Sequence, residues 1–347
     1  MSPPLTIAQL LATPGSGWGG MEQHTLSLAQ ALAARGHRVH VLAHPDYANR
    51  FPQPLNFQPL PMQLGRRNPW LRRRLRRSLR QLAADVVHAQ GNKAAALLSG
   101  TELGEAVRLG TLHGVKSSHA DFARLDAIIA VSKGVFESIQ HPRKQLIYNG
   151  IVPQASQPRD RLAALSPHHA RPLVIAAGRL EPVKGFESLI RAWAHLAPAG
   201  QLVIVGQGNQ QPQLQALIND SGLQQCITLA GYRNDLRDWL GHADACVLSS
   251  QREGFGYLVI EALQAGCPVL ATPVGCAPEL LPPDCLAVDS SGPALQNLLQ
   301  QHLPRLTQLR AQQADAMARA REHFTLVAMT EQTEACYRAL LSAGAGP

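Results

Sequence analysis

Short apolar runs alternate with longer segments of helical spacing along most of the chain. In the first half, the strand-like segments are 5–11, 38–44, 85–89, 107–113, 126–131 and 145–151. In the second half, they are 173–178, 201–206, 226–231, 245–250 and 268–273. Helical patterns fall at 21–35, from 69, at 92–98, from 133, and at 185–196, 257–264 and 303–341. Strands that alternate with helices predict parallel sheets covered on both faces.

The alternation stops once, at the polar, proline-containing segment 152–172, which predicts a linker. Because 347 residues exceed one ordinary core, two domains are expected. We predict an α/β chain of two tandem Rossmann-like, doubly wound domains facing a cleft. The predicted parts are an N-terminal domain at 1–152, a C-terminal domain at 153–325, and a final helix at 326–347 packing back on the first domain. Ligands of such sheets bind outside the carboxyl ends of the strands.

Composition narrows the class of protein. No apolar run approaches the roughly 20 residues that span a bilayer, and the N-terminal segment lacks the charged start of a signal peptide. The six cysteines form no C-x-x-C pair and lie partly in apolar runs, which predicts buried free thiols in a reduced cytosol. We therefore expect a cytoplasmic protein.

The net charge of +8 has one local source, an arginine-rich segment. Asn68-Pro69 predicts a helix start, and Leu71, Leu75 and Leu79 then share one face. The basic face, with Trp70 at its start, comprises Arg72, Arg73, Arg74, Arg76, Arg77 and Arg80. A solvated helix face is the simpler interpretation, but arginines without one acid favour an anionic membrane surface. Nucleic acid is not expected, because no aromatic platform or binding motif accompanies the charge.

A glycine-rich loop follows the first strand. Gly15, Gly17 and Gly20 satisfy G-x-G-x-x-G, the dinucleotide fingerprint. That fingerprint needs an acid at the end of the second strand, where this chain has Ala43-His44-Pro45. A nicotinamide-dependent oxidoreductase is therefore disfavoured, whereas a loop whose backbone approaches a phosphate or sugar is retained.

The most informative segment is bounded by Glu253 and Glu261. Gly254 and Gly256 leave bare backbone beside a carboxylate, which suits close approach to a phosphate. The helix predicted at 257–264 starts there, and a helix start binds anions. An ordinary surface turn would not require these glycines together with the strand that follows. We predict that the two carboxylates bracket a phosphate-sugar.

Further candidates follow predicted strands. Arg179 and Lys184, five residues apart, can both neutralise a diphosphate, although a surface pair with Glu181 is the simpler alternative. His113 ends a strand, where catalytic groups commonly lie, but histidine is plentiful in this chain. The segments with Gly206 and with Tyr232 and Arg233 each end a strand and can wall a base and ribose.

Taken in order, these segments resemble family 4 glycosyltransferases, which are retaining, nucleotide-sugar-dependent enzymes of the GT-B fold. The segments that carry the resemblance are GGMEQHTLSLAQALAARGHRVHVLAHP, His113-Gly114, DAIIAVSKGVFESI, YNGI, AAGRLEPVKGFESLIRA, LVIVGQG, LAGYRNDL and EGFGYLVIEALQAGCPVLATPVG. The chain departs from the family pattern after Asn149-Gly150, where an aspartate usually follows, and at Tyr257, where a smaller residue is commoner.

The resemblance implies a role for each matching residue. Arg179 and Lys184 would hold the donor diphosphate, Glu261 the ribose, and Glu253 the donor sugar. His113 would lie near that sugar and help to stabilise the transition state.

The remaining implied contacts come from backbone and base-binding positions. Gly17, Gly19 and Gly20 would wall the donor from the acceptor, and Tyr232 and Arg233 would lie near the base. The implied amide donors near phosphate and sugar are Phe255, Gly256, Tyr257 and Leu258.

The predicted function is retaining transfer of a hexose from a nucleotide-diphosphate sugar to a lipid-linked glycan, such as lipopolysaccharide core or another surface polysaccharide. The resemblance implies a fold that needs no divalent metal, and the sequence accordingly has no D-x-D motif. The enzyme would act in the cytoplasm, peripherally on the inner face of the membrane. The alternatives are a nucleotide-sugar epimerase of the same fold and a catalytically inactive glycan-binding or scaffold protein. UDP-, GDP- and ADP-sugars fit the sequence equally.

Overall fold

The computed structural model describes residues 3–15, 17–101, 103–115, 118–152, 171–196 and 200–344. The chain forms two compact units. Unit 1 comprises residues 1–152 together with 324–347, and unit 2 comprises residues 153–323. All of the segment 153–170, most of the predicted linker, lies outside the described residues.

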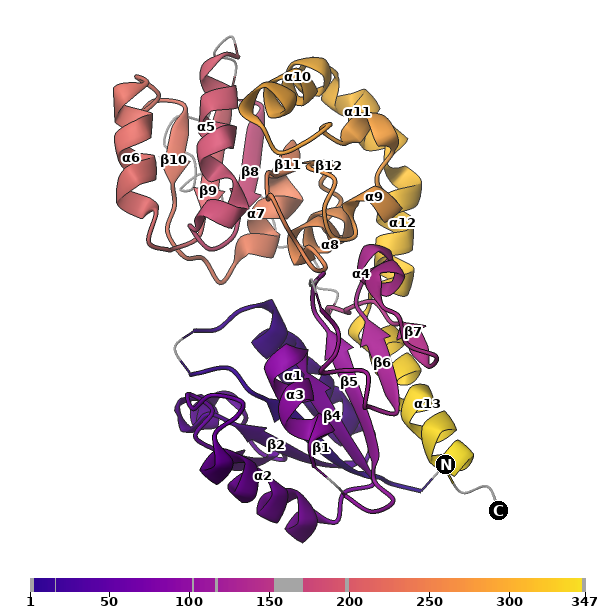
Figure 1. Cartoon of the computed structure of the whole chain (residues 1–347). Coiled ribbons are helices and arrows are strands. Elements are labelled where there is room, and N and C mark those ends of the chain that lie inside the picture. Colours follow the sequence, from indigo (N-terminus) through magenta and orange to yellow (C-terminus); the bar gives the residue numbers. More distant parts are fainter. Residues whose placement is uncertain are drawn as a thin grey trace. The chain divides into compact units, whose positions relative to one another are not determined.

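Within the described residues, unit 1 contains a seven-stranded sheet in the order β3-β2-β1-β4-β5-β6-β7 (Figure 1). Its strands are β1 (Thr6–Leu11), β2 (Arg38–Ala43), β3 (Asn56–Pro59), β4 (Val86–Gln90), β5 (Val107–Leu112), β6 (Ala127–Ala130) and β7 (Lys144–Leu146). All neighbouring strands run parallel, which confirms the predicted sheet type. The sequence prediction missed the edge strand β3, because its side chains are exposed or only half-buried and show no apolar alternation.

The helices of unit 1 begin where the local sequence predicts. They are α1 (Gly20–Ala34), α2 (Pro69–Leu82), α3 (Gly91–Ser99), α4 (Lys133–Ser138) and α13 (Leu326–Gly344), with a 3₁₀ turn η1 (Pro45–Arg50). At the start of α2, the Asn68 side chain accepts a hydrogen bond from the Leu71 amide at 3.1 Å. Ser132 caps α4 in the same way through the Val135 amide, at 3.3 Å. Both predicted starts are confirmed.

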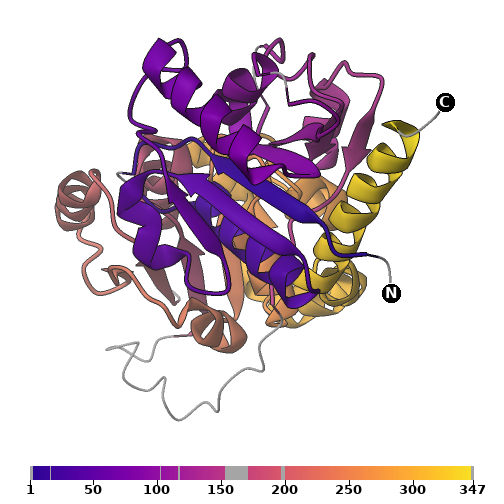
Figure 2. The same cartoon turned by 90° about the horizontal axis from the view of Figure 1, so that it is seen from below.

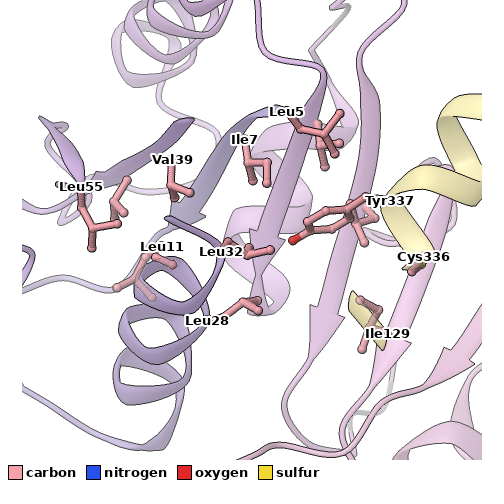
Figure 3. Close-up of a cluster of buried hydrophobic side chains, with 14 of the residues drawn as sticks. Leu5, Ile7, Leu11, Leu28, Leu32, Val39, Leu55, Ile129, Cys336 and Tyr337 are labelled. Atoms are coloured by element: carbon pink, nitrogen blue, oxygen red, sulfur yellow. The ribbon is translucent and has the colours of Figure 1, made fainter. Parts of the chain in front are cut away.

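Helix α13 belongs to unit 1 although it follows unit 2 in the sequence (Figures 1 and 2). The Ile151 amide donates to the Phe324 carbonyl at 3.1 Å, and the Leu326 amide donates back to Ile151 at 3.0 Å. Farther along, Tyr337 is fully buried in a cluster with side chains of β1 and α1, including Ile7 and Leu32 (Figure 3). Burial of one such side chain contributes about 1.5–3 kcal/mol, so this face fixes α13 on the unit.

Unit 2 repeats the plan with fewer strands. Its described residues contain a parallel sheet in the order β10-β9-β8-β11-β12. The strands are β8 (Leu173–Ala177), β9 (Gln201–Val205), β10 (Ile227–Leu229), β11 (Ala245–Leu248) and β12 (Val269–Ala271). The helices are α5 (Phe186–Ala194), α6 (Gln211–Asp220), α7 (Leu236–His242), α8 (Tyr257–Gln264), α9 (Ala277–Leu280), α10 (Gly292–His302), α11 (Leu306–Gln312) and α12 (Ala314–His323), with 3₁₀ turns η3 (Pro182–Lys184), η4 (Pro283–Cys285) and η5 (Leu303–Arg305).

The predicted helical segment 303–341 is one run of helices shared by the two units. Helices α11 and α12 lie in unit 2, whereas α13 lies in unit 1. Helices α6, α7, α9 and α10 were not predicted. Their boundaries lack strong start signals in most cases, although Ser291 does cap α10 through the Ala294 amide at 3.3 Å.

Both sheets reverse their strand order beside their first strand. In unit 1, β1 lies between β2 and β4, and in unit 2, β8 lies between β9 and β11. At such a point the connections leave in opposite directions, so the carboxyl ends of the two strands stay uncovered. The loops after β1 and β4, and those after β8 and β11, are therefore the places where ligand-binding residues are expected.

The cysteines and the helix lengths bear on the expectations drawn from composition. All six cysteines are free thiols, and five of them are buried, which confirms the predicted thiol state. No helix there has both the length and the apolar character that crossing a bilayer requires.

Gly150 tests the attachment of α13 to unit 1. A Cβ at this position would overlap the Thr325 carbonyl, and unlike many glycines here its φ is not positive. We expect Gly150→Ala to lower the free energy of unfolding of unit 1 by about 1–3 kcal/mol through overpacking, measured by urea denaturation. Gly134→Ala is the matched control, because a Cβ in α4 meets no atom within 4 Å. Equal stability of both variants would show that the contact with Thr325 is unimportant.

Candidate functional site

Lys184 and Glu253 meet at the strand-order reversal of unit 2. Lys184 follows β8 and Glu253 follows β11, and the Lys184 Nζ lies 2.5 Å from the Glu253 Oε1. Ser250 donates to the same oxygen at 2.8 Å. The two charged side chains are 21% and 15% exposed, so they are largely shielded from water. Two residues that are 69 positions apart in the sequence thus form one charged cluster.

Backbone contacts hold the loops after β8 and β11 together. The Ser249 hydroxyl donates to the Lys184 carbonyl at 2.9 Å, and the Gln251 amide donates to Val183 at 2.8 Å. Gly185 has a φ of +68°, and a Cβ there would overlap the Ser249 carbonyl. Glycine is therefore needed at this position both for its backbone conformation and for the close approach of the second loop.

The loop that carries Glu253 leads directly into α8. Gly256, at φ +88°, is the residue before the helix, and the helix begins at Tyr257. Gly275, after β12, allows its segment to approach this loop, because a Cβ would overlap the Phe255 carbonyl. The Cys276 amide donates to that carbonyl at 2.7 Å. The start of α8, which carries the positive end of the helix dipole, therefore follows Glu253 closely in the sequence and is packed into the same loop.

Glu261 lies on α8, one turn beyond its start. The Arg237 Nε, from α7, is 3.8 Å from the Glu261 Oε1, and the glutamate side chain is 23% exposed. Burial raises the pKa of the Glu261 carboxyl, and the positive charge of Arg237 opposes this shift. No sequence pattern singles out Arg237 or Ser250, because each finds its glutamate partner only in the folded unit.

Arg179 is not part of the charged cluster formed by Lys184 and Glu253. Its Nη1 lies 2.9 Å from the Glu181 Oε1, and its side chain is 64% exposed. This contact is the surface ion pair that was the simpler interpretation of Arg179 from the sequence. An exposed ion pair of this type contributes little to stability, so Arg179 can exchange Glu181 for another anion at low cost.

The loops after β8, β9 and β10 form one packed edge. The Gly206 amide donates to Gly231 at 2.8 Å, and a Cβ on Gly206 would overlap the Gly178 carbonyl. Arg233 binds Asp235 through two hydrogen bonds of 3.0 and 2.8 Å. The hydrogen bonds lower the pKa of Asp235 and raise that of Arg233. The neighbouring Tyr232 ring is 71% exposed.

In unit 1, the glycine-rich loop joins β1 to α1. The Gly19 amide donates to the Glu22 side chain at 3.0 Å, and Gly20 is the first helical residue. The Gly17 carbonyl accepts from the Tyr47 hydroxyl at 2.7 Å. A Cβ on Gly17 would meet nothing within 4 Å, so packing within the protein does not explain that glycine. An open backbone position is compatible with a ligand approaching the loop.

His113 follows β5 directly and is half-buried. Its Nε2 lies 2.8 Å from the Gln90 Oε1, and its ring packs edge-on against His24 with a centroid distance of 4.8 Å. Burial and then the neighbouring His24 and His88 hold the pKa of His113 well below its usual range. Burial also lowers the pKa of His24 to about 4 and that of His88 to about 3. His113 is therefore a neutral imidazole at neutral pH.

Helix α2 has the two faces that its sequence predicts. Leu71, Leu75 and Leu79 are buried in the core of unit 1. Trp70 is 55% exposed, and the Arg74 guanidinium lies 5.5 Å from its ring centroid. The arginines on the outer face are Arg73, Arg74, Arg76, Arg77 and Arg80, with Arg72 half-buried. In the described part of the chain, none of these six has a carboxylate within ion-pair distance.

Comparisons with known proteins agree with this architecture. The family profile described as "Glycosyl transferases group 1" matches residues 171–301, and that described as "Glycosyltransferase Family 4" matches residues 18–155. A lipopolysaccharide core biosynthesis glycosyltransferase, LpsE of Rhizobium meliloti, is 36% identical over 29% of this chain and 29% of its own. An N-acetylgalactosaminyltransferase of Campylobacter jejuni that acts on a diphospho-undecaprenol is 30% identical over 44% of this chain and 42% of its own. The matches thus span less than half of these relatives.

Solved structures extend the similarity to nearly the whole chain. Sucrose-phosphate synthase from Thermosynechococcus elongatus has a TM-score of 0.83 at 21% identity, covering 98% of this chain and 100% of its own. HepE from Anabaena, solved with UDP and glucose, also has a TM-score of 0.83 at 21% identity, with 96% and 100% covered. WaaG, a glycosyltransferase of lipopolysaccharide biosynthesis, has a TM-score of 0.70 at 18% identity, with 98% and 100% covered. At these identities the similarity establishes the GT-B fold.

The Lys184–Glu253 pair predicts how this site responds to an anion. Glu253 neutralises the charge of Lys184. A phosphate that binds Lys184 must therefore displace the Glu253 carboxylate or be repelled by its negative charge. We expect Glu253→Gln to increase affinity for inorganic pyrophosphate by roughly tenfold, or about 1.4 kcal/mol, with the gain shrinking at high salt. Isothermal titration calorimetry measures both. Glu187→Gln is the control, because Glu187 pairs with Arg191 on the exposed face of α5. Unchanged or weaker pyrophosphate binding would exclude Lys184 as an anion ligand.

Proposed function

Because the chain belongs to the family 4 glycosyltransferases and has the GT-B fold, we propose that it is a retaining enzyme that transfers a hexose from a nucleotide-diphosphate sugar. The observation that carries the proposal is the Lys184–Glu253 pair at the strand-order reversal of unit 2, where the loop leads into α8. A cation, a carboxylate and a helix start at one sheet edge match a ligand with negative phosphates and a polar sugar.

In the proposed complex, unit 2 binds the donor. Lys184 and Arg179 take the diphosphate, and the amides from Phe255 to Leu258 contribute hydrogen bonds at the helix start. Glu261 accepts hydrogen bonds from the ribose. Tyr232 and Arg233 lie near the base, with Gly206 at the neighbouring strand end. The raised pKa of Glu261 supports a role in which its carboxylate gains partners on binding, since burial leaves it poorly solvated.

Catalysis would depend on charge at both sides of the breaking bond. Departure of the nucleotide diphosphate places negative charge near Lys184 and Arg179, and preorganised charge of this kind is often the largest catalytic contribution. We propose attack from the same face as the departing phosphate, which itself accepts the acceptor proton. Glu253 then orients the sugar, and the neutral His113 contacts it. A sugar covalently trapped on Glu253 would contradict this assignment.

The proposed acceptor is a lipid-linked glycan, such as lipopolysaccharide core or another surface polysaccharide. Two relatives support this class, since one is named for lipopolysaccharide core biosynthesis and another acts on a diphospho-undecaprenol glycan. Gly17, Gly19 and Gly20 would separate acceptor from donor. Helix α2 of unit 1 would hold the enzyme peripherally on the cytoplasmic face of the membrane. No divalent metal is part of the proposal, because Lys184 and Arg179 supply the positive charge.

The donor is tested by binding of UDP-, GDP- and ADP-glucose, scored together with their slow hydrolysis. We expect one of the three to be preferred, and Lys184→Ala to reduce its hydrolysis by roughly 10²–10³-fold, as loss of a charge-stabilising group does. Glu261→Ala should remove the preference for that ribonucleotide over its 2′-deoxy form. EDTA should have no effect. The control is again Glu187→Gln. Hydrolysis that survives Lys184→Ala and Glu261→Ala unchanged would remove this site assignment.

The membrane-facing role of α2 is tested with vesicles containing phosphatidylglycerol. Each basic residue near an anionic surface contributes on the order of 1 kcal/mol. We therefore expect the triple variant Arg73→Gln, Arg74→Gln, Arg77→Gln to bind these vesicles more than roughly 100-fold less tightly at low salt, measured by co-sedimentation.

The matched control changes the same net charge elsewhere on unit 1. It replaces three exposed arginines outside α2: Arg38, Arg124 and Arg143. We expect this variant to bind nearly as tightly as the native protein. Equal losses of affinity in the two triple variants would mean that net charge, and not helix α2, directs binding. A native protein that fails to bind the vesicles would contradict the proposal.

A further inference from the structure

A chain of buried polar side chains connects His113 to helix α13. Its other members are Gln90 and His88 on β4, Gln9 on β1 and Tyr337 on α13. All four are at most 1% exposed, and Tyr337 lies among the apolar side chains of unit 1 (Figure 3). Buried polar groups are costly unless they are hydrogen-bonded. Packing alone therefore does not explain a connected set of this many buried polar side chains.

The hydrogen bonds of this chain run in one consistent direction. The Gln90 Nε2 donates to the Gln9 Oε1 at 2.8 Å, and the Gln9 Nε2 donates to the Tyr337 hydroxyl at 3.3 Å. The hydroxyl proton is then directed to the His88 Nδ1, 2.6 Å away. His88 in turn donates from its Nε2 to the Thr111 hydroxyl at 2.7 Å. Each group donates once and accepts once along this path.

The same direction determines the proton position on His113. The Gln90 Oε1 is a pure acceptor, and it lies 2.8 Å from the His113 Nε2. The imidazole must therefore carry its proton on Nε2 and leave Nδ1 as an acceptor. The opposite tautomer would require both glutamine amides to be turned over, together with the protons of Tyr337 and His88. The tautomer of His113 is thus coupled to a hydroxyl on α13.

We propose that Gln90 and Tyr337 are positioning residues that hold His113 as the Nε2–H tautomer, which leaves its Nδ1 as a hydrogen-bond acceptor for a sugar hydroxyl. This inference rests on the proposed function, in which His113 contacts the donor sugar. It also gives α13 a role in the chain of hydrogen bonds: the helix supplies the hydroxyl that joins Gln9 to His88.

The groups around His113 favour the neutral ring. From α1, His24 packs against it, and from β4, His88 lies near enough to act on its charge. Neither His24 nitrogen has a hydrogen bond of normal geometry, although Asn149 lies near enough to raise the pKa of His24 slightly against the larger effect of burial. In the described residues, the ionisable groups that shift the pKa of His113 are thus two other histidines. Protonation of one ring disfavours protonation of the next, because the charges are alike.

A different tautomer population is expected if the network is purely structural. If these side chains only docked α13 on the sheet, either proton direction would satisfy them equally, and His113 would populate both tautomers. The tautomer is therefore the decisive observable, and it can be measured in the free protein without any donor.

The experiment is nitrogen-15 NMR of the full chain labelled at histidine, with His113 assigned from the signals lost in His113→Asn. For the native protein we expect a protonated Nε2 and an unprotonated Nδ1, unchanged from pH 7 to pH 5. Tyr337→Phe should yield a mixture of the two tautomers. Thr333→Val is the matched control, because Thr333 lies on α13 and donates only to the Met329 carbonyl within the helix; it should retain the native spectrum.

A second variant probes the Gln90 contact directly. Gln90→Glu keeps the acceptor but adds a charge, so the midpoint of the His113 titration should rise by roughly one to three pH units. A native Nδ1–H tautomer, or no shift in Gln90→Glu, would overturn the proposal. A pure Nε2–H tautomer in Tyr337→Phe would overturn the role of Tyr337. Failure of the native protein to hydrolyse UDP-, GDP- or ADP-glucose would contradict the proposed function and would leave the tautomer result standing.

Discussion

The reversal of strand order beside the first strand of each sheet is the constraint on which the rest of this protein depends. In unit 2, β8 lies between β9 and β11, so the connections on either side of β8 leave in opposite directions. The ends of β8 and β11 therefore stay open, and the loops that follow them meet. Lys184 and Glu253 pair at this place. In unit 1 the same arrangement brings the glycine-rich loop after β1 close to the end of β4, where Gln90 begins the chain to His113.

The charged pair at this edge is the reason for proposing one site for an anion and a sugar. Lys184 and Glu253 are mostly shielded from water, and Ser250 supplies a further hydrogen bond to the carboxylate. A phosphate that binds Lys184 replaces Glu253 as its partner, which releases the carboxylate for another donor of hydrogen bonds. The interaction that satisfies the free protein is thus the one that a donor would exchange. Arg179, whose exposed side chain pairs with Glu181, can join at little cost.

Helix α13 shows how a distant segment can take part in a site that it does not line. Gly150 permits close approach of the chain at Thr325, and the apolar face of α13 then buries Tyr337 against β1 and α1. Apolar burial supplies the stability, whereas the hydroxyl of Tyr337 joins Gln9 and His88 in one set of hydrogen bonds. The one helix therefore couples packing of the unit to the proton position on His113.

The sequence by itself determined the α/β class, the two parallel sheets and the arginine helix, and it brought forward the candidate site residues. These features have local causes: apolar periodicity, Asn68 and Ser132 as caps, and glycines such as Gly256 that permit a positive φ. It missed β3, whose side chains are mostly outside the core, and helices such as α6 and α7. It also could not find Ser250, Arg237, Gln90 or Tyr337 as partners. Their roles come from contacts between residues 3 to 328 positions apart. Only the tertiary structure decided these contacts, because strand order and helix docking, and not local propensity, bring such side chains together.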